Sequence, residues 1–481
     1  MNKPLRRLSI AVLVMFGLLL LNANYLQVVR AESLHNNSNN PRLILEEYSR
    51  QRGPIVVGGK QIARSVETNN RLKYKRTYAQ GKLYAPATGF YSLVYGASGI
   101  EAAENSILSG TDDSLFVRRV IDLLTREPPQ GGSVSLTLNA RAQKAAYDGL
   151  NGRKGAVAAI DPSTGAILAL VSSPSYDPNL LASHDAAAVR RSYKRLSENP
   201  NKPMLNRALR ETYTPGSTFK VVTAAAALEN GMTKDTKVFN GPQLDLPQTT
   251  SNLPNENGRP CNPGGEATLQ DALAFSCNAS FGKVGLDLGA AALAAQARKF
   301  GFGEAFTIPM RSAVSRFPQN LNPPQTAQSA IGQFSVQATP LQMAMVAAAT
   351  ANTGRVMSPY LVQELRAPDL SPLDITKPKE LGQAMSPQSA QQLTDMMVNV
   401  VENGTGTNGQ IPGIRVAGKT GTAQQGGGRR PHAWFISFAP AENPKVAVAV
   451  VIENGGEAAE ISGNQLAAPI ARDVMRAVLG R

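Results

Sequence analysis

The chain has 481 residues, of which 42% are hydrophobic and 17% charged, so it can bury a large core and is not disordered throughout. Its 49 Lys and Arg residues exceed its 35 Asp and Glu residues, giving a net charge of +14, but they are scattered, and we expect no nucleic-acid partner. Two Cys and three His residues exclude a multi-cysteine metal cluster, and we expect neither a metal nor another cofactor.

The N-terminus carries a membrane-targeting pattern. Lys3, Arg6 and Arg7 precede an apolar run from Leu8 to Val29. The run is long enough to span about 30 Å of hydrocarbon as a helix, and its positive flank predicts a cytoplasmic N-terminus and an extracytoplasmic remainder. Cleavage of a signal peptide near residues 31–33 is the alternative, but no A-x-A pattern closes the run, which favours an uncleaved single-pass anchor.

Turn-rich segments divide the exported part of the chain. The polar stretch His35–Pro41 predicts a loop, and Glu127–Gly132 has the composition of a linker. Between them, the run Pro54–Val57 predicts a short strand. We therefore predict three parts: a short tail and transmembrane anchor at 1–29, a small mixed N-terminal domain at 30–132 and a larger domain at 133–481.

The larger domain has strands at both ends and helices between them. Ala156–Ile160 and Ala166–Val171 flank the turn residues Asp161–Gly165, which predicts a hairpin. An amphipathic helix is predicted at Gln465–Leu479. Three late strands precede it, at Ile414–Ala423, Ala433–Ala439 and Val446–Glu453. This order predicts a mixed α/β (α+β) fold, in which one antiparallel sheet is built from both chain ends and flanked by helices.

The first of three chemical motifs places a serine three residues before a lysine. A Pro-Gly pair precedes Ser217, and the run after Lys220 predicts a helix that ends near Gly231. The i,i+3 spacing stacks both side chains, which suits a serine nucleophile that gives its proton to a neutral lysine. A second copy, Ser280 to Lys283, shows that this pattern also fits a capping serine beside an unrelated surface lysine.

The second motif is Ser276 and Asn278, inside a helix-like region from Leu269 to Phe281. Side chains at i and i+2 do not share a helix face, but at a helix end or turn both could point into one cleft. There the hydroxyl could relay a proton to a leaving amine, and the amide could hold a substrate backbone. The Ser-x-Asn pattern recurs in the chain, so it carries little weight by itself.

The third motif, Lys419–Thr422, lies in the predicted strand that begins at Ile414. Alternation predicts Lys419 and Gly421 on one side, and a glycine within a strand marks the close approach of another backbone. A strand edge beside a nucleophile can pair with an extended peptide. Lys419 would supply charge for a substrate carboxylate and lower the pKa of Lys220. A plain surface lysine on an edge strand is the alternative.

The order of the three motifs resembles that of the penicillin-recognising serine enzymes. From Ser133 to Arg481 the chain resembles the class B penicillin-binding proteins of the actinobacterial PbpA type, also in the stretches Gly155–Asn179, Thr339–Ala344 and Pro431–Ile436. Glu47–Gly53 resembles the start of that type's pedestal. The resemblance implies a penicillin-binding transpeptidase fold, a small pedestal or dimerisation-type domain and one transmembrane helix.

The resemblance implies that Ser217 is the acylated nucleophile, Lys220 its base and Ser276 the relay that gives a proton to the departing D-alanine. The family reaction is transpeptidation: the serine attacks a D-Ala-D-Ala bond of a peptidoglycan stem peptide, and an amine from a neighbouring stem resolves the acyl-enzyme. β-Lactams acylate the same serine. The partners implied are stem peptides, β-lactams, the cell membrane and a glycan polymerase or division protein.

The same resemblance implies the substrate-binding residues. Asn278 would bind the substrate amide, and Lys419 and Thr420 would contact the terminal carboxylate. The backbone N–H groups of Ser217 and Thr422 would form the oxyanion hole. Lys419, Thr420 and Thr422 lie in the same predicted strand as Gly421, so Gly421 belongs to the same binding edge.

The only two cysteines are Cys261 and Cys277, 16 positions apart and both in the exported part. Cys277 stands where the β-lactamases have Asp, and we expect no catalytic role for it. A disulfide between the two would contribute about 3 kcal/mol of stability in a chain-entropy estimate, and an exported location permits it. Two buried free thiols are the alternative.

Three functions fit these observations. An anchored transpeptidase for division or cell shape is the first, because the chain has the three ordered motifs and the anchor. The segment between anchor and linker is too short for the glycosyltransferase domain of class A relatives. The same fold could act as a D,D-carboxypeptidase or β-lactamase, but the sequence assigns no glutamate to a deacylating water. A non-catalytic sensor or division scaffold is the third, although a sensor needs a cytoplasmic region and only seven residues precede the apolar run.

Overall fold

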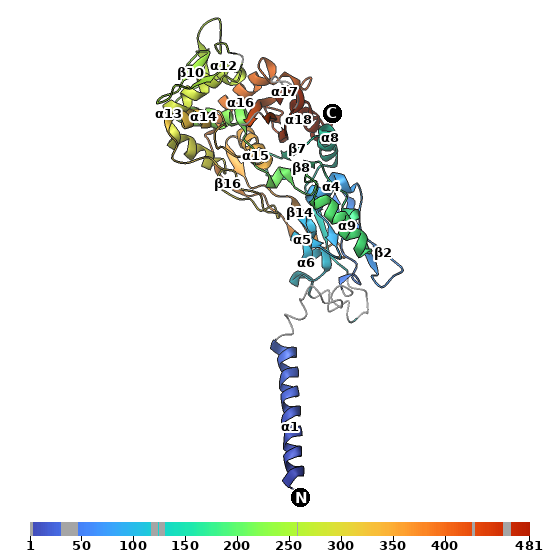
Figure 1. The fold of residues 1–481 in the computed structure, drawn as a ribbon. Coiled ribbons are helices and arrows are strands. Elements are labelled where there is room, and N and C mark those ends of the chain that lie inside the picture. The colour runs from blue at the N-terminus through green and yellow to red at the C-terminus, as the bar shows by residue number, and fades with distance from the viewer. Residues whose placement is uncertain are drawn as a thin grey trace.

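The N-terminal segment forms a long apolar helix, as the sequence predicts. In the computed structural model, the described residues are 3–29, 47–116, 124, 130–256, 258–425, 429–455 and 463–481. Helix α1 (Lys3–Asn24) continues into a π-helical turn at Tyr25–Val29 and has the length and composition to cross a membrane. Figure 1 shows α1 apart from the folded remainder. The loop predicted at 35–41 and linker residues 127–129 lie outside the described residues.

A six-stranded sheet lies between α1 and the larger part of the molecule (Figure 1), in the order β15-β14-β6-β1-β2-β3. Its strands are β1 (Ile55–Val57), β2 (Lys60–Glu67), β3 (Tyr74–Tyr78), β6 (Ser133–Leu136), β14 (Val362–Arg366) and β15 (Pro372–Ile375). β1 runs parallel to β6, and the other neighbours are antiparallel. Two strands from late in the chain thus complete a sheet that the N-terminal segment begins. A domain division at residue 132 remains a prediction.

Buried charge ties the N-terminal elements together. The carboxylate of Glu101, in helix α5 (Gly99–Ala103), is fully buried and lies 2.6 Å from Arg52 and 2.6 Å from Arg76. Removing one partner from such a buried group leaves an uncompensated charge, which is strongly destabilising. The three residues therefore fix α5, β3 and the chain that enters β1 relative to one another.

The second sheet confirms the antiparallel sheet that the sequence predicts from both chain ends. Its order is β17-β18-β19-β7-β8, with every neighbouring pair antiparallel. The strands are β7 (Gly155–Ile160), β8 (Ile167–Ser173), β17 (Ala417–Gln425), β18 (Arg429–Ala439) and β19 (Val446–Ile452). β7 and β19 are buried along their whole length, so both faces of the sheet are covered by other elements.

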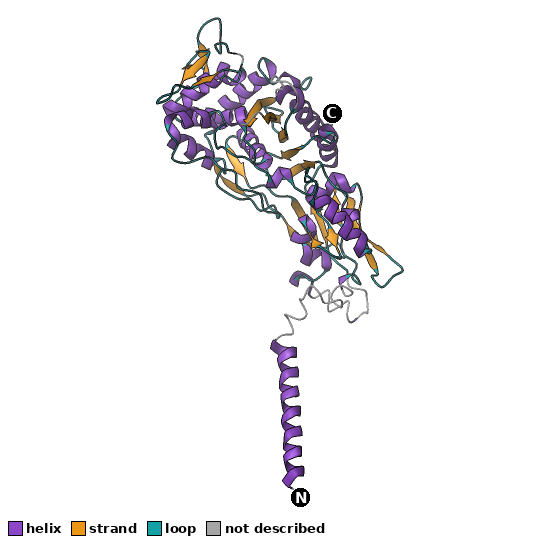
Figure 2. Ribbon diagram, viewed as in Figure 1, coloured by secondary structure: helices purple, strands orange, loops and turns teal. Residues whose placement is uncertain are grey.

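Helices cover the two faces of this sheet. On one face pack α8 (Ala140–Leu150) and α18 (Ala468–Leu479), and on the other lies α15 (Pro340–Ala351). Figure 2 shows the helices gathered around the short strands in this part of the molecule. The helices inserted between β8 and β17 include α11 (Lys220–Glu229), α12 (Leu269–Ala274), α13 (Asn278–Lys299), α14 (Pro323–Ala330) and α16 (Pro387–Glu402).

Several predicted elements have different bounds in the structure, and two of these differences have a clear local cause. The strand predicted from Ile414 starts at Ala417, because Ile414 closes a turn in which its N–H donates to Ile411 O at 3.0 Å. The single helix predicted at Gln465–Leu479 is two helices, α17 (Gly463–Leu466) and α18. A proline in the first turn of α18 explains the second difference, since proline favours helix starts over helix interiors.

Candidate active site

Ser217 lies on a short 3₁₀-helix, η4 (Gly216–Phe219), that leads directly into α11. Side chains three residues apart eclipse one another in a 3₁₀-helix, so a backbone of this kind favours the predicted stacking of Ser217 and Lys220, which remains a prediction. The preceding Gly216 has a φ of 54°, and a Cβ there would lie 2.8 Å from Thr422 O. Glycine thus lets the serine turn approach strand β17 closely. The Ser217 hydroxyl makes no hydrogen bond within the described part of the chain.

Lys220 is fully buried, and its Nζ donates to Ser276 O at 2.6 Å and to Asn278 Oδ1 at 2.7 Å. Burial, and next the ammonium of Lys419, hold the pKa of Lys220 well below its usual value, while the carboxylate of Glu256 acts in the opposite direction. The same Nζ also lies 3.3 Å from Ser276 Oγ, so its described partners are two carbonyl oxygens and one hydroxyl. A lowered pKa favours the neutral form of an amine, whose lone pair can take up a proton.

Ser276 occupies a turn between two helices, so the helix-like region predicted from Leu269 to Phe281 is not one helix. Helix α12 ends at Ala274, α13 begins at Asn278, and Ser276 between them has a φ of 60°. This turn aims the Ser276 hydroxyl at both lysines: its Oγ lies 2.9 Å from Lys419 Nζ and 3.3 Å from Lys220 Nζ. The turn also directs the Asn278 amide oxygen to Lys220.

Lys419 on β17 is fully buried, which excludes the alternative of a plain surface lysine. Its Nζ donates to Ser276 Oγ and, at 3.0 Å, to Thr420 O. Burial lowers the pKa of Lys419 to about 7, and the Glu256 carboxylate opposes that shift. The Thr420 hydroxyl is 2.7 Å from the hydroxyl of Thr405. Two buried amines and the partly exposed Ser276 hydroxyl thus form one connected group.

Gly421 and Thr422 bring the strand edge against the serine turn. A Cβ on Gly421 would lie 2.9 Å from Thr218 Cγ2 and 3.1 Å from Pro215 O, so the close backbone approach predicted there is present. Thr422 is partly exposed and lines the same cleft as Ser217. The roles of these residues in binding substrate remain predictions.

The cleft that Ser217 and Thr422 line has a volume of about 890 Å³. Its lining also includes Asn278, Phe334 and the segment Asn252–Glu256, which contains strand β11 (Asn252–Pro254) and the turn after it. Sequence reasoning missed Glu256 because it lies in no chemical motif. Its long-range approach to the two lysines is a product of the fold, and no local pattern marks it.

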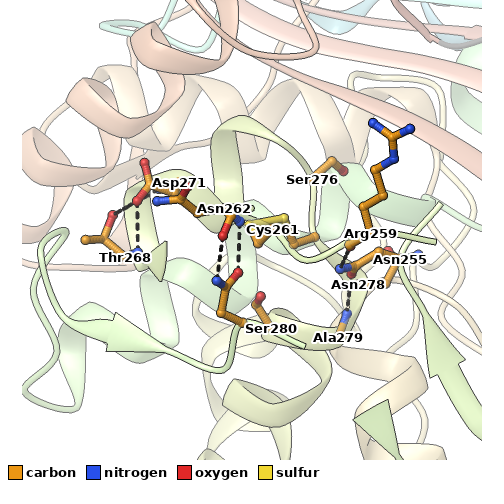
Figure 3. The surroundings of a disulfide bond; sticks show 12 residues. Asn255, Arg259, Cys261, Asn262, Thr268, Asp271, Ser276, Asn278, Ala279 and Ser280 are labelled. Atoms are coloured by element: carbon orange, nitrogen blue, oxygen red, sulfur yellow. Dashed lines mark hydrogen bonds between the residues drawn. A yellow bond between two sulfur atoms is a disulfide. The ribbon is translucent and has the colours of Figure 1, made fainter. Parts of the chain in front are cut away.

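A disulfide joins Cys261 and Cys277, with their Cα atoms 5.6 Å apart, and there are no free cysteines. Figure 3 shows this bond beside Asn255, whose Oδ1 accepts from Ala279 N at 2.9 Å. In addition, the side chain of Asn278 donates to Pro254 O at 3.1 Å. The covalent bond and these two hydrogen bonds fasten the Asn252–Glu256 wall of the cleft to the Ser276 turn.

The described residues include no group of three or more His, Cys, Asp or Glu side chains that could hold a metal ion. The cleft is lined by the hydroxyls of Ser217 and Thr422, by several amides and by the Glu256 carboxylate. The amines of Lys220 and Lys419 are buried next to Ser276. A serine beside a neutral amine, together with a strand edge, can carry out acyl transfer through a covalent intermediate.

Comparison with known proteins agrees with this chemistry. Residues 155–476 match the family profile of the penicillin binding protein transpeptidase domain, and residues 52–134 match that of the penicillin binding protein A dimerisation domain. The peptidoglycan D,D-transpeptidase PbpA of Mycolicibacterium smegmatis is 47% identical over 100% of this chain and 99% of its own length. PbpA of Mycobacterium tuberculosis is 46% identical over the same shares.

Solved structures lead to the same family. Penicillin-binding protein A from M. tuberculosis, as its ceftriaxone acyl-enzyme complex, has a TM-score of 0.88 at 45% identity, covering 90% of this chain and 100% of that chain. The imipenem acyl-enzyme complex of the same protein has a TM-score of 0.87 at 46% identity, covering the same shares of each chain. With its three motifs gathered at one cleft, the chain belongs to the penicillin-binding protein transpeptidases, and it resembles the PbpA type along its whole length.

Proposed function

We propose that this chain is a membrane-anchored peptidoglycan D,D-transpeptidase, which β-lactams inactivate by acylating Ser217. The observation that supports this most is the connected group in which Ser276 Oγ lies 2.9 Å from the Nζ of the buried Lys419 and 3.3 Å from that of the buried Lys220. PbpA relatives that are 46% and 47% identical carry the name peptidoglycan D,D-transpeptidase, and the M. tuberculosis protein forms acyl-enzymes with two β-lactams. Transfer of that activity to this chain is consistent with its whole-length similarity.

In the proposed acylation step, Ser217 Oγ attacks the carbonyl carbon between the two D-alanines of a donor stem. Its proton passes to the lone pair of Lys220, and the carbonyl oxygen becomes an oxyanion near the N–H groups of Ser217 and Thr422. Loss of one such donor would slow the reaction by about 10²–10³-fold, by analogy with other serine hydrolases. The C–N bond then breaks, Ser276 passes its proton to the nitrogen of the departing D-alanine, and Lys220 gives Ser276 the proton that it took from Ser217.

The second half of the reaction resolves the acyl-enzyme. An uncharged amine of a neighbouring stem attacks the ester carbon, loses a proton to the Ser276 and Lys220 group, and displaces Ser217 Oγ, which regains its hydrogen. Asn278 and Thr420 would hold the donor, and Lys419 would attract its carboxylate. Lys220 takes up one proton and passes it on in each half of the reaction, so it returns to its starting protonation after each cycle.

The proposal includes a location and partners. The positive residues before the apolar part of α1 favour an N-terminus in the cytoplasm and an extracytoplasmic cleft. The residues 30–132 would form a pedestal that holds the transpeptidase domain, 133–481, away from the membrane. A glycan polymerase or another division protein would bind the pedestal, because a transpeptidase consumes glycan strands that a separate enzyme must supply.

Hydrolysis is the second candidate, and Glu256 is the observation in its favour, because a carboxylate that lines the cleft with Ser217 could activate water. The lifetime of a penicillin adduct separates the two functions. Release within seconds would favour a β-lactamase or carboxypeptidase, whereas persistence over many minutes would favour the transpeptidase.

A labelled penicillin tests the proposal directly. The full-length protein should become labelled, mass mapping should place the label on Ser217, and Ser217→Ala should abolish it. Ser280→Ala is the matched control, because it removes the same atom from the same Ser-x-x-Lys pattern, and it should still be labelled. A wild-type protein that never labels, or a Ser217→Ala variant that labels equally, would contradict the proposal.

A further inference from the structure

A second pocket continues the active-site cleft beyond the serine turn. It has a volume of about 480 Å³ and shares four lining residues with the cleft: Gln333, Phe334, Gln424 and Gln425. Thr214, three residues before the nucleophile, also lines it. We call this space the side pocket. A substrate group that enters it can therefore belong to the molecule whose carbonyl lies at Ser217.

Hydrogen bonds fix the walls of the side pocket before any substrate arrives. Gln337 donates to the Thr214 hydroxyl at 3.2 Å, and Gln425 donates to Asn454 Oδ1 at 2.9 Å. The Tyr213 hydroxyl donates to Glu453 Oε1 at 2.9 Å. The first and third bonds hold the segment before the serine turn to Gln337 and to the chain just after β19, and the second joins that chain to the end of β17. The side pocket is thus a preformed space, which lowers the cost of ordering a ligand in it.

Two carboxylates line the side pocket, and they differ in their partners. Glu453 is already satisfied, since Arg207 Nε lies 2.8 Å and Lys154 Nζ 3.5 Å from its carboxylate. Glu211 has neither a hydrogen bond nor an ion pair to any residue that the structure describes. The described lining contains no Lys or Arg. Among the described lining residues, the unmatched charge is therefore negative.

We propose that the side pocket binds the side-chain ammonium of the donor stem peptide, with the Glu211 carboxylate as its counter-charge. The inference rests on the proposed transpeptidase function. In that function, the side-chain amine of an acceptor stem resolves the acyl-enzyme. Donor and acceptor stems are of one kind, so every donor carries such an amine. An amine held at Glu211 is not free to attack the carbonyl at Ser217. The geometry thus assigns the side pocket to the donor stem. The acceptor stem would reach the ester at Ser217 through the part of the cleft outside the side pocket.

Charge also separates the two ends of the donor. Its terminal carboxylate would lie near Lys419, and its side-chain ammonium near Glu211, so a donor bound in reverse would place like charges together. Such like-charge contacts are a common source of specificity. Glu211 is a specificity-determining residue in this account, and the lysines and Ser276 do the chemistry without it.

A pair of donors tests the inference: a stem pentapeptide with a free side-chain amine, and its copy with that amine acetylated. The quantity measured is the ratio of kcat/KM for the free donor to kcat/KM for the acetylated donor, from D-alanine release by the full-length protein. The wild type should favour the free donor. Glu211→Gln should reduce the ratio by up to about five-fold, the range expected of a partly exposed ion pair. Glu211→Lys should bring it below one.

Glu67→Gln on β2 is the matched control, because it removes a carboxylate that lines neither the cleft nor the side pocket, and its ratio should equal that of the wild type. Because the ratio is internal to each protein, general damage to a variant cancels. An unchanged ratio in both Glu211 variants would overturn the inference while leaving the transpeptidase function standing. Absence of turnover with either donor, together with absence of penicillin labelling, would instead overturn the function.

A second experiment, with the acetylated donor, tests whether the side pocket binds the acceptor stem instead of the donor stem. With that donor fixed, the concentration of an amine-bearing stem acceptor is varied, and cross-linked product is measured. The inference predicts the same acceptor KM in the wild type and in Glu211→Gln. A several-fold higher acceptor KM in the variant would move the side pocket to the acceptor and overturn the assignment to the donor.

Discussion

The chain contains two Ser-x-x-Lys pairs with identical spacing and opposite environments. Lys220 is fully buried beside a second amine, and Ser217 faces the cleft. Lys283 has a side chain that is 44% exposed and is paired with Asp287 one helical turn away. Ser280 is buried, and its hydroxyl donates to Phe239 O at 2.6 Å. The spacing is therefore common to both pairs, and burial together with the partner of the lysine decides which serine can act.

Replacing each lysine in turn gives the largest expected difference between the pairs. Lys220→Met should lower the rate of acylation by penicillin about 10²–10⁴-fold, the usual contribution of a general base. Lys283→Met should leave the rate nearly unchanged, since it removes an exposed ion pair far from any proton transfer. Stopped-flow or gel-based labelling measures both. Equal effects of the two substitutions would mean that the environment of Lys220 does not set its role.

The disulfide is the next test, because it fastens the Ser276 turn. That turn contacts Lys220 of the first Ser-x-x-Lys pair, and no such contact is found for Lys283 among the described residues. Replacing Cys261 and Cys277 together by Ala should lower the free energy of unfolding by about 3 kcal/mol, the chain-entropy estimate for a loop of this length. Acylation should also slow, because Ser276 would no longer be held against Lys220 and Lys419. Chemical denaturation and penicillin labelling give the two numbers. Unchanged stability would show that the loop is held by its other contacts alone.

Lys220 and Lys283 should also contribute differently to the pH dependence of the free energy of unfolding. The folded-state pKa of Lys220 is lowered, whereas the unfolded chain binds a proton up to a pKa of about 10.4. The unfolded state therefore binds more protons between these two values, and the free energy of unfolding rises with pH across that window, by at most about 1.4 kcal/mol per pH unit for this group.

Lys220→Met should remove that part of the slope and stabilise the protein at neutral pH, because methionine has no charge to desolvate. Lys283→Met should keep the wild-type slope. Thermal unfolding between neutral pH and the alkaline limit of solubility measures it. A slope that survives in Lys220→Met at full size would show that this lysine is an ordinary protonated amine in the folded state.

Glu256→Gln is expected to have the smallest effect on acylation. It tests how much a nearby carboxylate contributes to the environment of Lys220. Its carboxylate raises the pKa of both Lys220 and Lys419, so its removal should lower both. The acid limb of the pH profile for acylation should therefore move to lower pH, modestly, because Glu256 is exposed to solvent. Glu266→Gln, a substitution of another exposed glutamate outside the cleft lining, is the control and should not move it. A shift toward higher pH would contradict the proposed electrostatics.

Much of the fold follows from local sequence. The β-branched and alanine-rich runs at 156–160 and 166–171 predict the hairpin because a fully buried strand is apolar on both faces. The strand predicted from Pro54 to Val57 is also present, but its sheet could not be completed from sequence. Strands β14 and β15 come from residues 362–375, and no local pattern shows that they pair with the N-terminal segment.

The geometry of the site was predictable only in part, for a similar reason. The spacing of Ser217 and Lys220 is local, so their stacking can be predicted from the chain itself. The break at Ser276 is not local: neither glycine nor proline marks it, and contacts with Lys220 and Lys419 and the neighbouring disulfide stabilise its positive φ. The approach of Glu256 to the lysines depends on the tertiary fold in the same way.

The protonation state of Lys220 tests the central claim most directly. Heteronuclear NMR of selectively labelled lysine side chains in the full-length protein, with Lys220→Met and Lys283→Met to assign two signals, follows each amine as the pH is raised. The account predicts that Lys220 is already neutral at physiological pH while Lys283 stays charged to well above it. If Lys220 held its proton as firmly as Lys283, the burial and neighbouring charge seen here would not be what activates Ser217.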